Sequence, residues 1–191
     1  MPQALQRTAV SFRIAASSFH RYNGSVTIPK SLPYTRSCFV CGAENPVGLK
    51  MRFFRDPHTK TGVRATFRFA EHHVGFRGVI HGGILATVLD EAMAWAGAVA
   101  TRRFGIGAEL NVRFLKSVAA GQDLIVTAEL AVDHKRLREC RGEIRDAKGT
   151  VYAKGTAKFV PLADAQLQAF HSDLRWDETT VRPEEVLEFV R

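Results

Sequence analysis

The sequence predicts an α+β fold in which an antiparallel sheet curls around one long central helix. Between Gly78 and Ala100, strong helix formers place apolar residues on every side of the helical wheel, as expected for an interior helix. Short segments of alternating apolar and polar residues flank this stretch, and brief turns join them, which favours antiparallel pairing. A helix that is apolar all round needs a sheet that wraps it.

The elements follow from these patterns in chain order. Residues 1–36 lack a sustained period and are expected to form a flexible N-terminal extension, with a mitochondrial transit peptide as the alternative because they contain Arg and Ser but no acid. Residues 37–161 form the expected central domain. Residues 162–191 form a tail with two short helical signals. The expected strands are residues 49–54 and 63–69 before the helix, and 109–118, 124–130, 138–144 and 151–159 after it.

The central stretch also carries the candidate chemistry. Asp90 and Glu91 are the only charged residues between Arg77 and Arg102, and burying a carboxylate is costly without a functional or structural return. At the start of the helix, free backbone N–H groups of Gly82 and Gly83 are suited to stabilise an oxyanion.

Asp90 and Gly82 lie too far apart on one helix to serve one substrate. Eight residues separate them, which corresponds to about 12 Å of helix, whereas a reacting carbonyl must lie ~3 Å from both groups. If both act in catalysis, Gly82 of one subunit must meet Asp90 of another, so the hypothesis requires a symmetric oligomer.

The run HGGILATVLDE resembles the helix of hotdog-fold acyl-CoA thioesterases of the phenylacetate-pathway type. The resemblance extends from CFVCGAENPVGLKMRF through GVIHGG to ELNVRFLKSV. It implies hydrolysis of acyl-CoA to free acid and CoA, with Asp90 as general base or nucleophile and Gly82 as oxyanion donor. It further implies that His81 shapes the turn. The resemblance also implies that the predicted fold, a sheet wrapped around one helix, is the hotdog fold.

The sequence departs from the family pattern at two glycines. Family members commonly carry Asn or Gln where this chain has Gly75, and some carry a hydroxyl residue where we place Gly107. His73, Arg77 and Glu91 are the possible substitutes. The candidate catalytic residues are Asp90, Gly82, His81, Gly83 and Glu91, with Glu91 also open to a structural role beside an arginine; the candidate substrate-binding residues are His73, Gly75, Arg77, Gly107, Arg113 and Lys116.

Composition sets outer bounds on these hypotheses. The chain has 191 residues, 46% of them hydrophobic and 24% charged, which fits one soluble domain, and no uninterrupted apolar run reaches the ~18 residues of a membrane span. Its net charge of +8 suits an acidic small molecule such as coenzyme A, whereas the basic residues do not cluster as in nucleic-acid-binding proteins. We expect a cytoplasmic homodimer or homotetramer, or a mitochondrial matrix protein if residues 1–36 are a transit peptide.

Three cysteines fit a reducing compartment better than a disulfide scaffold. Cys38-x-x-Cys41 is compatible with half of a zinc site or a redox pair, but no second pair follows, so we expect two small structural residues. The histidines 72, 73 and 81 also lack a suitable partner for a metal. No metal and no separate cofactor are therefore expected, since coenzyme A is part of the substrate.

Two other functions stay open. The first is a non-catalytic hotdog protein that binds acyl-CoA or a related apolar acid, an alternative kept open by Gly75 and Gly107. The second is a hotdog dehydratase or hydratase, although the His-and-Pro-Gly motif expected of that class is missing.

Overall fold

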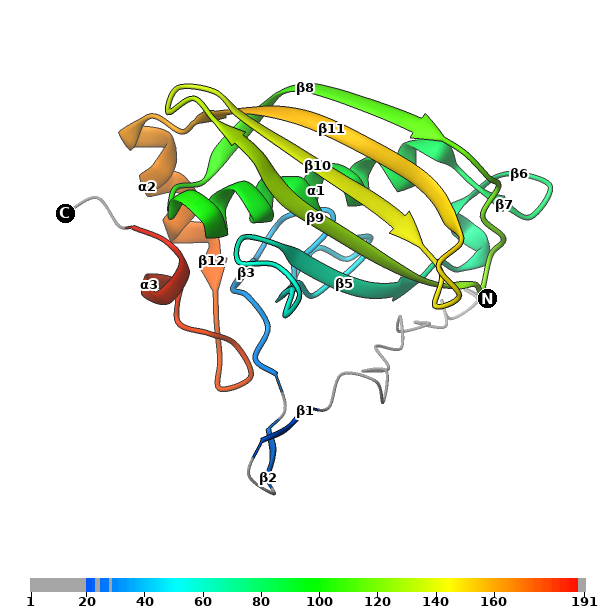
Figure 1. Ribbon diagram of the computed structural model, residues 1–191, viewed down its shortest axis with the longest axis horizontal. Coiled ribbons are helices and arrows are strands. Elements are labelled where there is room, and N and C mark those ends of the chain that lie inside the picture. Colours follow the sequence, from blue (N-terminus) through cyan, green and yellow to red (C-terminus); the bar gives the residue numbers. More distant parts are fainter. Residues whose placement is uncertain (1–19, 23–24, 28, 189–191) are drawn as a thin grey trace, which may run out of the picture.

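A six-stranded antiparallel sheet dominates the computed structural model, which describes residues 20–22, 25–27 and 29–188 (Figure 1). Its strands lie in the order β4-β5-β9-β10-β11-β8. Their bounds are β4 Phe54–Arg55, β5 Val63–Arg68, β8 Gly105–Phe114, β9 Asp123–Asp133, β10 Arg138–Arg145 and β11 Val151–Pro161. The α+β prediction, with one long helix against an antiparallel sheet, is confirmed.

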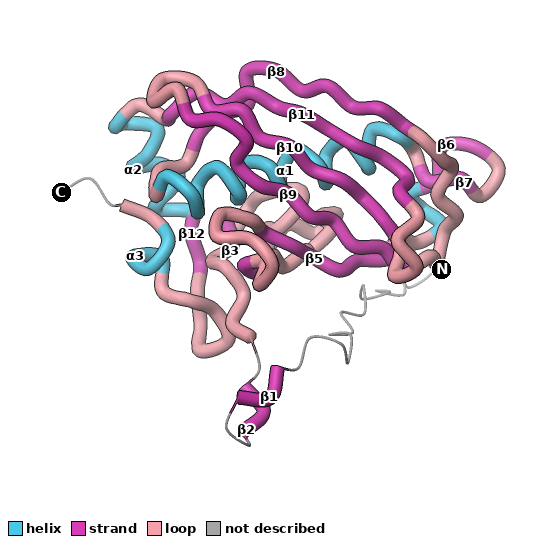
Figure 2. Tube along the Cα trace, viewed as in Figure 1, coloured by secondary structure: helices cyan, strands magenta, loops and turns pink. Residues whose placement is uncertain are grey.

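Shorter elements lie outside this sheet, and the β1-β2 hairpin projects away from it (Figure 2). Three two-stranded pairings, β1-β2, β3-β12 and β6-β7, lie outside it. Their bounds are β1 His20–Tyr22, β2 Ser25–Thr27, β3 Tyr34–Thr35, β12 Leu174–Arg175, β6 Val74–Phe76 and β7 Val79–Ile80, and the short helices are η2 Glu71–His73, α2 Asp164–Asp173 and α3 Pro183–Val186.

The long helix α1, Gly82–Thr101, lies along the inner face of the sheet, which curves around it (Figure 1). All residues from Ala92 to Val99 are buried, and the Trp95 side chain is fully covered. By length and composition α1 is apolar enough to cross a membrane, but 61% of its most apolar window is buried inside this fold. The sheet therefore supplies the apolar surroundings that the sequence of α1 requires.

A pair of glycines lets α1 approach the sheet closely. Gly142 on β10 and Gly155 on β11 are directly paired, and both lie under Met93. A Cβ on Gly142 would lie 3.3 Å from Met93 Cγ, and one on Gly155 would lie 3.2 Å from Met93 Cε. The absence of side chains at these two positions makes room for the methionine, so the helix and the sheet are packed without a gap.

Two expected strands differ from the structure. Residues 49–53 are not part of the sheet: alternate residues are buried, but Leu49 and Met51 donate their N–H groups to Phe39 and Val40 in the preceding loop. The alternation of apolar and polar residues at 49–53 therefore reflects alternating burial, and not hydrogen bonding to a neighbouring strand. The strand expected at 109–118 is instead β8, which begins at Gly105 and ends at Phe114. Beyond Phe114, Leu115 and Lys116 both donate their N–H groups to the carbonyl of Tyr152, so the regular ladder with β11 stops there.

Part of the expected N-terminal extension is packed into the fold. Residues 1–19 lie outside the described residues, but Leu32 is buried and donates its N–H to the carbonyl of Phe53. β3 pairs with β12 of the tail, so residues 34–35 and 174–175 lie side by side. The tail also packs, since Phe170 stacks on Phe104 with ring centroids 4.1 Å apart.

Candidate active site

The N-terminus of α1 is shaped by His81, as the sequence predicts. His81 is the N-cap, and its Nδ1 accepts a hydrogen bond of 2.9 Å from the backbone N–H of Gly83. Ile84 donates its N–H to the backbone carbonyl of His81. The Gly82 N–H has no acceptor among the described residues and lies at the positive end of the helix dipole. Of the two glycines, Gly82 therefore has the free N–H group, whereas the N–H of Gly83 is bound by the N-cap side chain of His81.

A small hollow of about 340 Å³ opens beside Gly82. The ring of Phe114, at the end of β8, covers this glycine so closely that a Cβ there would lie 3.2 Å from ring atom Cζ. Lys116 lines the same hollow and is exposed. The site thus combines a free N–H donor, an aromatic wall and a cation.

Asp90 lies two turns further along α1 and faces the start of β8. Its Oδ1 would lie 3.5 Å from a Cβ on Gly107, so the missing side chain leaves space next to the carboxylate. Burial raises the pKa of Asp90 above its ordinary value. Among the described residues no cation forms an ion pair with it. A half-buried, unpaired carboxylate of this kind is a stronger base than an exposed one.

The loop before α1 places its candidate residues in different roles. Gly75 on β6 packs against the imidazole of His81, where a Cβ would lie 2.8 Å from Cδ2, so a larger residue is sterically excluded. His73 Nδ1 accepts the N–H of Ala70, and burial, with a further contribution from His72, lowers its pKa. Arg77 is exposed, with its guanidinium 5.3 Å from the ring centroid of Phe76. Of the candidates in this loop, Gly75 is the one that contacts the N-cap side chain.

Glu91 faces a different environment from Asp90. Its Oε1 accepts from Trp95 Nε1 at 3.2 Å, and the thiol of Cys38 lies 3.6 Å from Oε2. Trp95 and Cys38 are thus the partners of Glu91, in place of the arginine expected from the sequence. Burial, with the nearby Cys38, raises the pKa of Glu91 to about 8, whereas the hydrogen bond from Cys41 is the main cause that lowers the pKa of Cys38 to about 5. Sequence reasoning missed this cluster because Glu91 lies 53 residues from Cys38.

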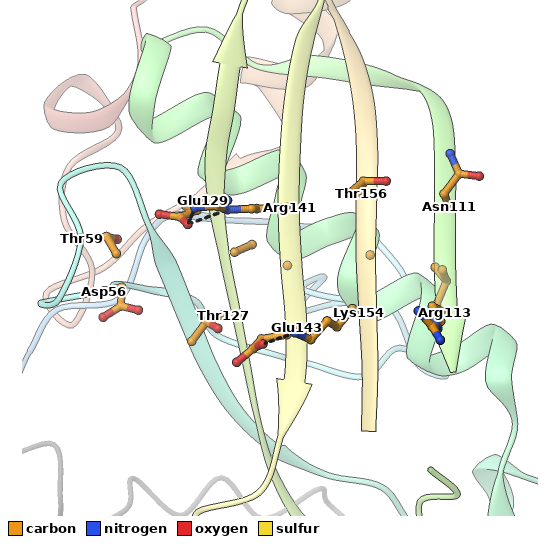
Figure 3. Close-up of a pocket in the computed structure, with 14 residues that line it drawn as sticks. Asp56, Thr59, Asn111, Arg113, Thr127, Glu129, Arg141, Glu143, Lys154 and Thr156 are labelled. Atoms are coloured by element: carbon orange, nitrogen blue, oxygen red, sulfur yellow. Dashed lines mark hydrogen bonds and ion pairs between the residues drawn. The ribbon is translucent and has the colours of Figure 1, made fainter. Parts of the chain in front are cut away.

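Arg113 lies away from both candidate groups. It lines a groove of about 710 Å³ on the outer face of the sheet, where the labelled side chains are polar (Figure 3). Acidic and basic residues pair within this groove, with Arg141 Nη2 2.7 Å from Glu129 and Lys154 Nζ 3.8 Å from Glu143. This groove is therefore lined by charged side chains that pair with one another, and neither Gly82 nor Asp90 lines it.

β8 connects the two candidate groups and forms the edge of the sheet. Among the described residues its only hydrogen-bonded neighbour is β11. Leu110 and Phe114 pair with the buried residues Ala157 and Ala153, so they share the inner face, yet both remain exposed, at 39% and 53%. The strand passes Asp90 near its start and Gly82 near its end. An apolar, unpaired edge of this kind is a template for another strand.

Comparison with protein families gives a match to the thioesterase superfamily over residues 77–153. Acyl-coenzyme A thioesterase THEM4 of Bos taurus is 28% identical over 128 residues, or 65% of this chain and 51% of that protein. Acyl-coenzyme A thioesterase 13 of Homo sapiens is 26% identical over 95 residues, or 49% of this chain and 68% of that protein. The matched region thus spans about half the length of the bovine relative.

Solved structures share the fold. A thioesterase superfamily protein with 28% identity gives a TM-score of 0.61, covering 66% of this chain and 61% of that chain. The Escherichia coli PaaI protein from the phenylacetic acid degradation operon gives 0.55 at 19% identity, covering 60% and 81%. A Streptococcus mutans protein bound to acetyl CoA gives 0.51 at 18% identity, covering 55% and 83%.

Proposed function

We propose that this chain hydrolyses acyl-CoA thioesters to the free acid and CoA, because residues 77–153 match the thioesterase superfamily and thioesterase superfamily structures share its fold. In this proposal Asp90 of one subunit and the Gly82 N–H of a partner subunit act on the same thioester. The observation that carries it is the path of β8, an apolar sheet edge that begins beside Asp90 and ends beside Gly82.

The edge strand explains how two copies would complete each site. When two identical edge strands pair in antiparallel fashion about a two-fold axis, the start of one lies beside the end of the other. The Gly107 end of β8, with Asp90, would then meet the Phe114 end of the partner's β8, with its Gly82. Within one chain the two groups are separated by about 12 Å of helix. Pairing therefore supports two equivalent sites in a homodimer.

The chemistry follows from the two groups. The Gly82 N–H, at the positive end of the helix, would donate to the thioester oxygen as negative charge develops there. Asp90 would either take a proton from a water that attacks the carbonyl carbon, or attack this carbon itself to give an anhydride that water then cleaves. Both routes break the carbon–sulfur bond and release CoA as the thiol. In a single turnover in ¹⁸O-water, a product without ¹⁸O would identify the anhydride route with water attacking the Asp90 carbonyl, because only then does an Asp90 oxygen leave with the acid.

Coenzyme A recognition would begin at Lys116. This cation lines the hollow beside Gly82, whereas Arg113 lies on the outer face of the sheet. The Streptococcus mutans protein of similar fold binds acetyl CoA, which supports a CoA ester as the ligand class. We therefore assign phosphate contact to Lys116 ahead of Arg113.

A thiol-release assay tests the proposal. The purified chain is incubated with short, aromatic and long acyl-CoA esters, and free CoA is detected with a chromogenic disulfide. We expect turnover of at least one class. No release above the uncatalysed rate from any ester would contradict thioesterase activity.

A second candidate function is non-catalytic binding of acyl-CoA. Gly107 places no polar side chain beside Asp90, and Gly75 places only backbone against His81, so neither glycine positions a water. Saturable binding of a non-hydrolysable CoA thioether, together with no release of thiol from the matching ester, would favour this candidate.

A further inference from the structure

Three metal-ligating side chains converge where the loop after β3 meets α1. They are the thiols of Cys38 and Cys41 in that loop and the carboxylate of Glu91 on the helix. Their ligand atoms all lie within 4.8 Å of one another. Glu91 directly follows Asp90 in α1, but the proposed reaction uses none of the three side chains.

The spacing of these atoms matches that of a tetrahedral zinc ion. With zinc–sulfur and zinc–oxygen bonds of about 2.3 and 2.0–2.2 Å, a sulfur and an oxygen on the same ion lie about 3.6 Å apart. Cys38 Sγ and Glu91 Oε2 lie 3.6 Å apart. The centre of a triangle with 4.8 Å sides, the upper limit here, lies about 2.8 Å from each corner, so movements of about half an ångström would complete all three bonds.

The surrounding groups hold the ligands in place. Cys38 Sγ accepts the backbone N–H of Val40 at 3.2 Å, which stabilises a thiolate. Trp95 Nε1–H holds Glu91 Oε1 and leaves Oε2 directed at the sulfur. The turn is closed by the Gly42 N–H, which donates to the carbonyl of Cys38, and a Cβ on Gly42 would lie 2.2 Å from that oxygen. Such outer contacts are typical of groups that orient metal ligands.

We propose that Cys38, Cys41 and Glu91 form a binding site for a thiophilic divalent cation, with Zn²⁺ as the preferred ion. Two thiolates favour zinc over magnesium or calcium, which prefer oxygen ligands. Arg52 does not neutralise the negative charge of the two thiolates, because its Nη1 donates a hydrogen bond to the backbone carbonyl of Cys41. Three protein ligands leave a fourth position for water. This proposal departs from the sequence expectation of no metal, because that expectation lacked Glu91 as the third ligand.

The site would fasten the loop to the helix next to the candidate catalytic carboxylate. Cys41 is buried, whereas Cys38 and Glu91 are half-buried. Because Glu91 directly follows Asp90, a bound ion would fix this turn of α1 from a side about 100° away from the one that Asp90 faces. Zinc binding at this site does not depend on whether the protein hydrolyses thioesters.

The test measures zinc binding by the full chain. Purified protein is stripped with a chelator under reducing conditions and dialysed against ZnCl₂, and bound zinc is quantified by mass spectrometry. Binding of Co²⁺ in place of zinc is followed by absorption. We expect one equivalent of zinc, intense visible bands of tetrahedral cobalt with a thiolate charge-transfer band, and a higher melting temperature on zinc addition.

Three variants locate the metal. Cys38→Ser and Glu91→Gln should each lower zinc occupancy at least tenfold at a fixed competing chelator, and Cys38→Ser should weaken the charge-transfer band. Cys140→Ser, at a buried free cysteine on β10, is the matched control and should retain one equivalent. Wild-type protein that binds less than a tenth of an equivalent, or a Cys38→Ser variant with full occupancy, would overturn the proposal.

Discussion

Asp90 and Glu91 are adjacent in sequence, but their carboxylates have separate surroundings. Successive residues of a helix are rotated by about 100°, so Asp90 faces Gly107 on β8, whereas Glu91 faces Cys38 and Trp95. Burial raises the pKa of both. Asp90 has no side chain opposite it at Gly107, and Glu91 is held by protein partners. The two carboxylates therefore face different neighbours, although they are adjacent in the sequence.

Replacing Asp90 by Asn tests its role as base or nucleophile. The amide keeps the size of the side chain but removes basicity, so kcat for acyl-CoA hydrolysis should fall by about 10² to 10⁴. Thiol release measures the effect, and the melting temperature shows that the fold survives. Glu44→Gln, at an exposed carboxylate, is the control and should keep wild-type turnover. Undiminished turnover in Asp90→Asn would refute the assignment.

His73 gives the loop before α1 a defined response to pH. Its neutral Nδ1 accepts the Ala70 N–H, and folding lowers its pKa, chiefly through burial. Protonation therefore favours the unfolded chain. The stability from this contact is complete above the unfolded pKa of about 6.5 and is lost as the pH falls through the lower folded pKa.

We expect acidification to increase hydrogen exchange at the Ala70 amide, after correction for the intrinsic pH dependence of exchange. In His73→Asn the side-chain oxygen can still accept this N–H but does not titrate, so the pH-dependent part of the protection should disappear. A His73 titration midpoint at or above 6.5, observed by NMR, would contradict the expected direction of the pKa shift.

At the scale of elements, the fit between α1 and the sheet depends on side chains that are absent. Gly142 and Gly155 form a pair across β10 and β11, and Met93 fills the space above them. A helix methionine and two strand glycines thus act as one packing unit. Substitutions in this unit should be coupled, because each changes the volume available to the others.

A double-mutant cycle tests this unit. Met93→Ala removes buried volume and should cost about 2–5 kcal/mol of unfolding free energy, whereas Gly155→Ala crowds Met93 Cε and should cost about 1–3 kcal/mol. In the double variant the new methyl group occupies part of the cavity, so the loss should be smaller than the sum. Urea denaturation measures all three values. Strict additivity would show that the two sites do not share space.

Sequence reasoning succeeded for elements with a clear period and failed where burial had another cause. The helix was predicted within a few residues of Gly82–Thr101, because no other stretch combines its length with its apolar content. Residues 49–53 alternate like a strand, but their N–H groups bond to a loop outside the sheet. Alternation reports which residues are buried, and it does not report which backbone pairs with which.

At the scale of the whole molecule, the sequence predicts the parts of the candidate site, and in the proposed function a second copy would complete it. The motif identified His81, Gly82 and Asp90, and the structure adds that β8 passes both ends of the site. The third member of the Cys38 cluster was not predictable, because only the folded chain brings Glu91 to the cysteines. Contacts between distant segments leave no local pattern in the sequence.

Mixing two inactive variants tests the shared site. Asp90→Asn and Gly82→Val are each expected to be inactive, the second because a bulky side chain at Gly82 would block access to its N–H. After unfolding and refolding together in equal amounts, half of the dimers should be mixed, and each would hold one intact site, restoring about one quarter of wild-type activity. Differently tagged subunits quantify the mixed dimers. Mixed dimers without restored activity would place both groups within one chain.

The exposed edge of β8 also has a consequence for how catalysis depends on protein concentration. If each reaction centre is divided between two chains, separating them abolishes both centres simultaneously, and an isolated chain retains none. Activity per milligram should then decline as the enzyme is diluted, and it should recover on concentration. The cell would thus set the output of this protein through its abundance as well as through its substrate.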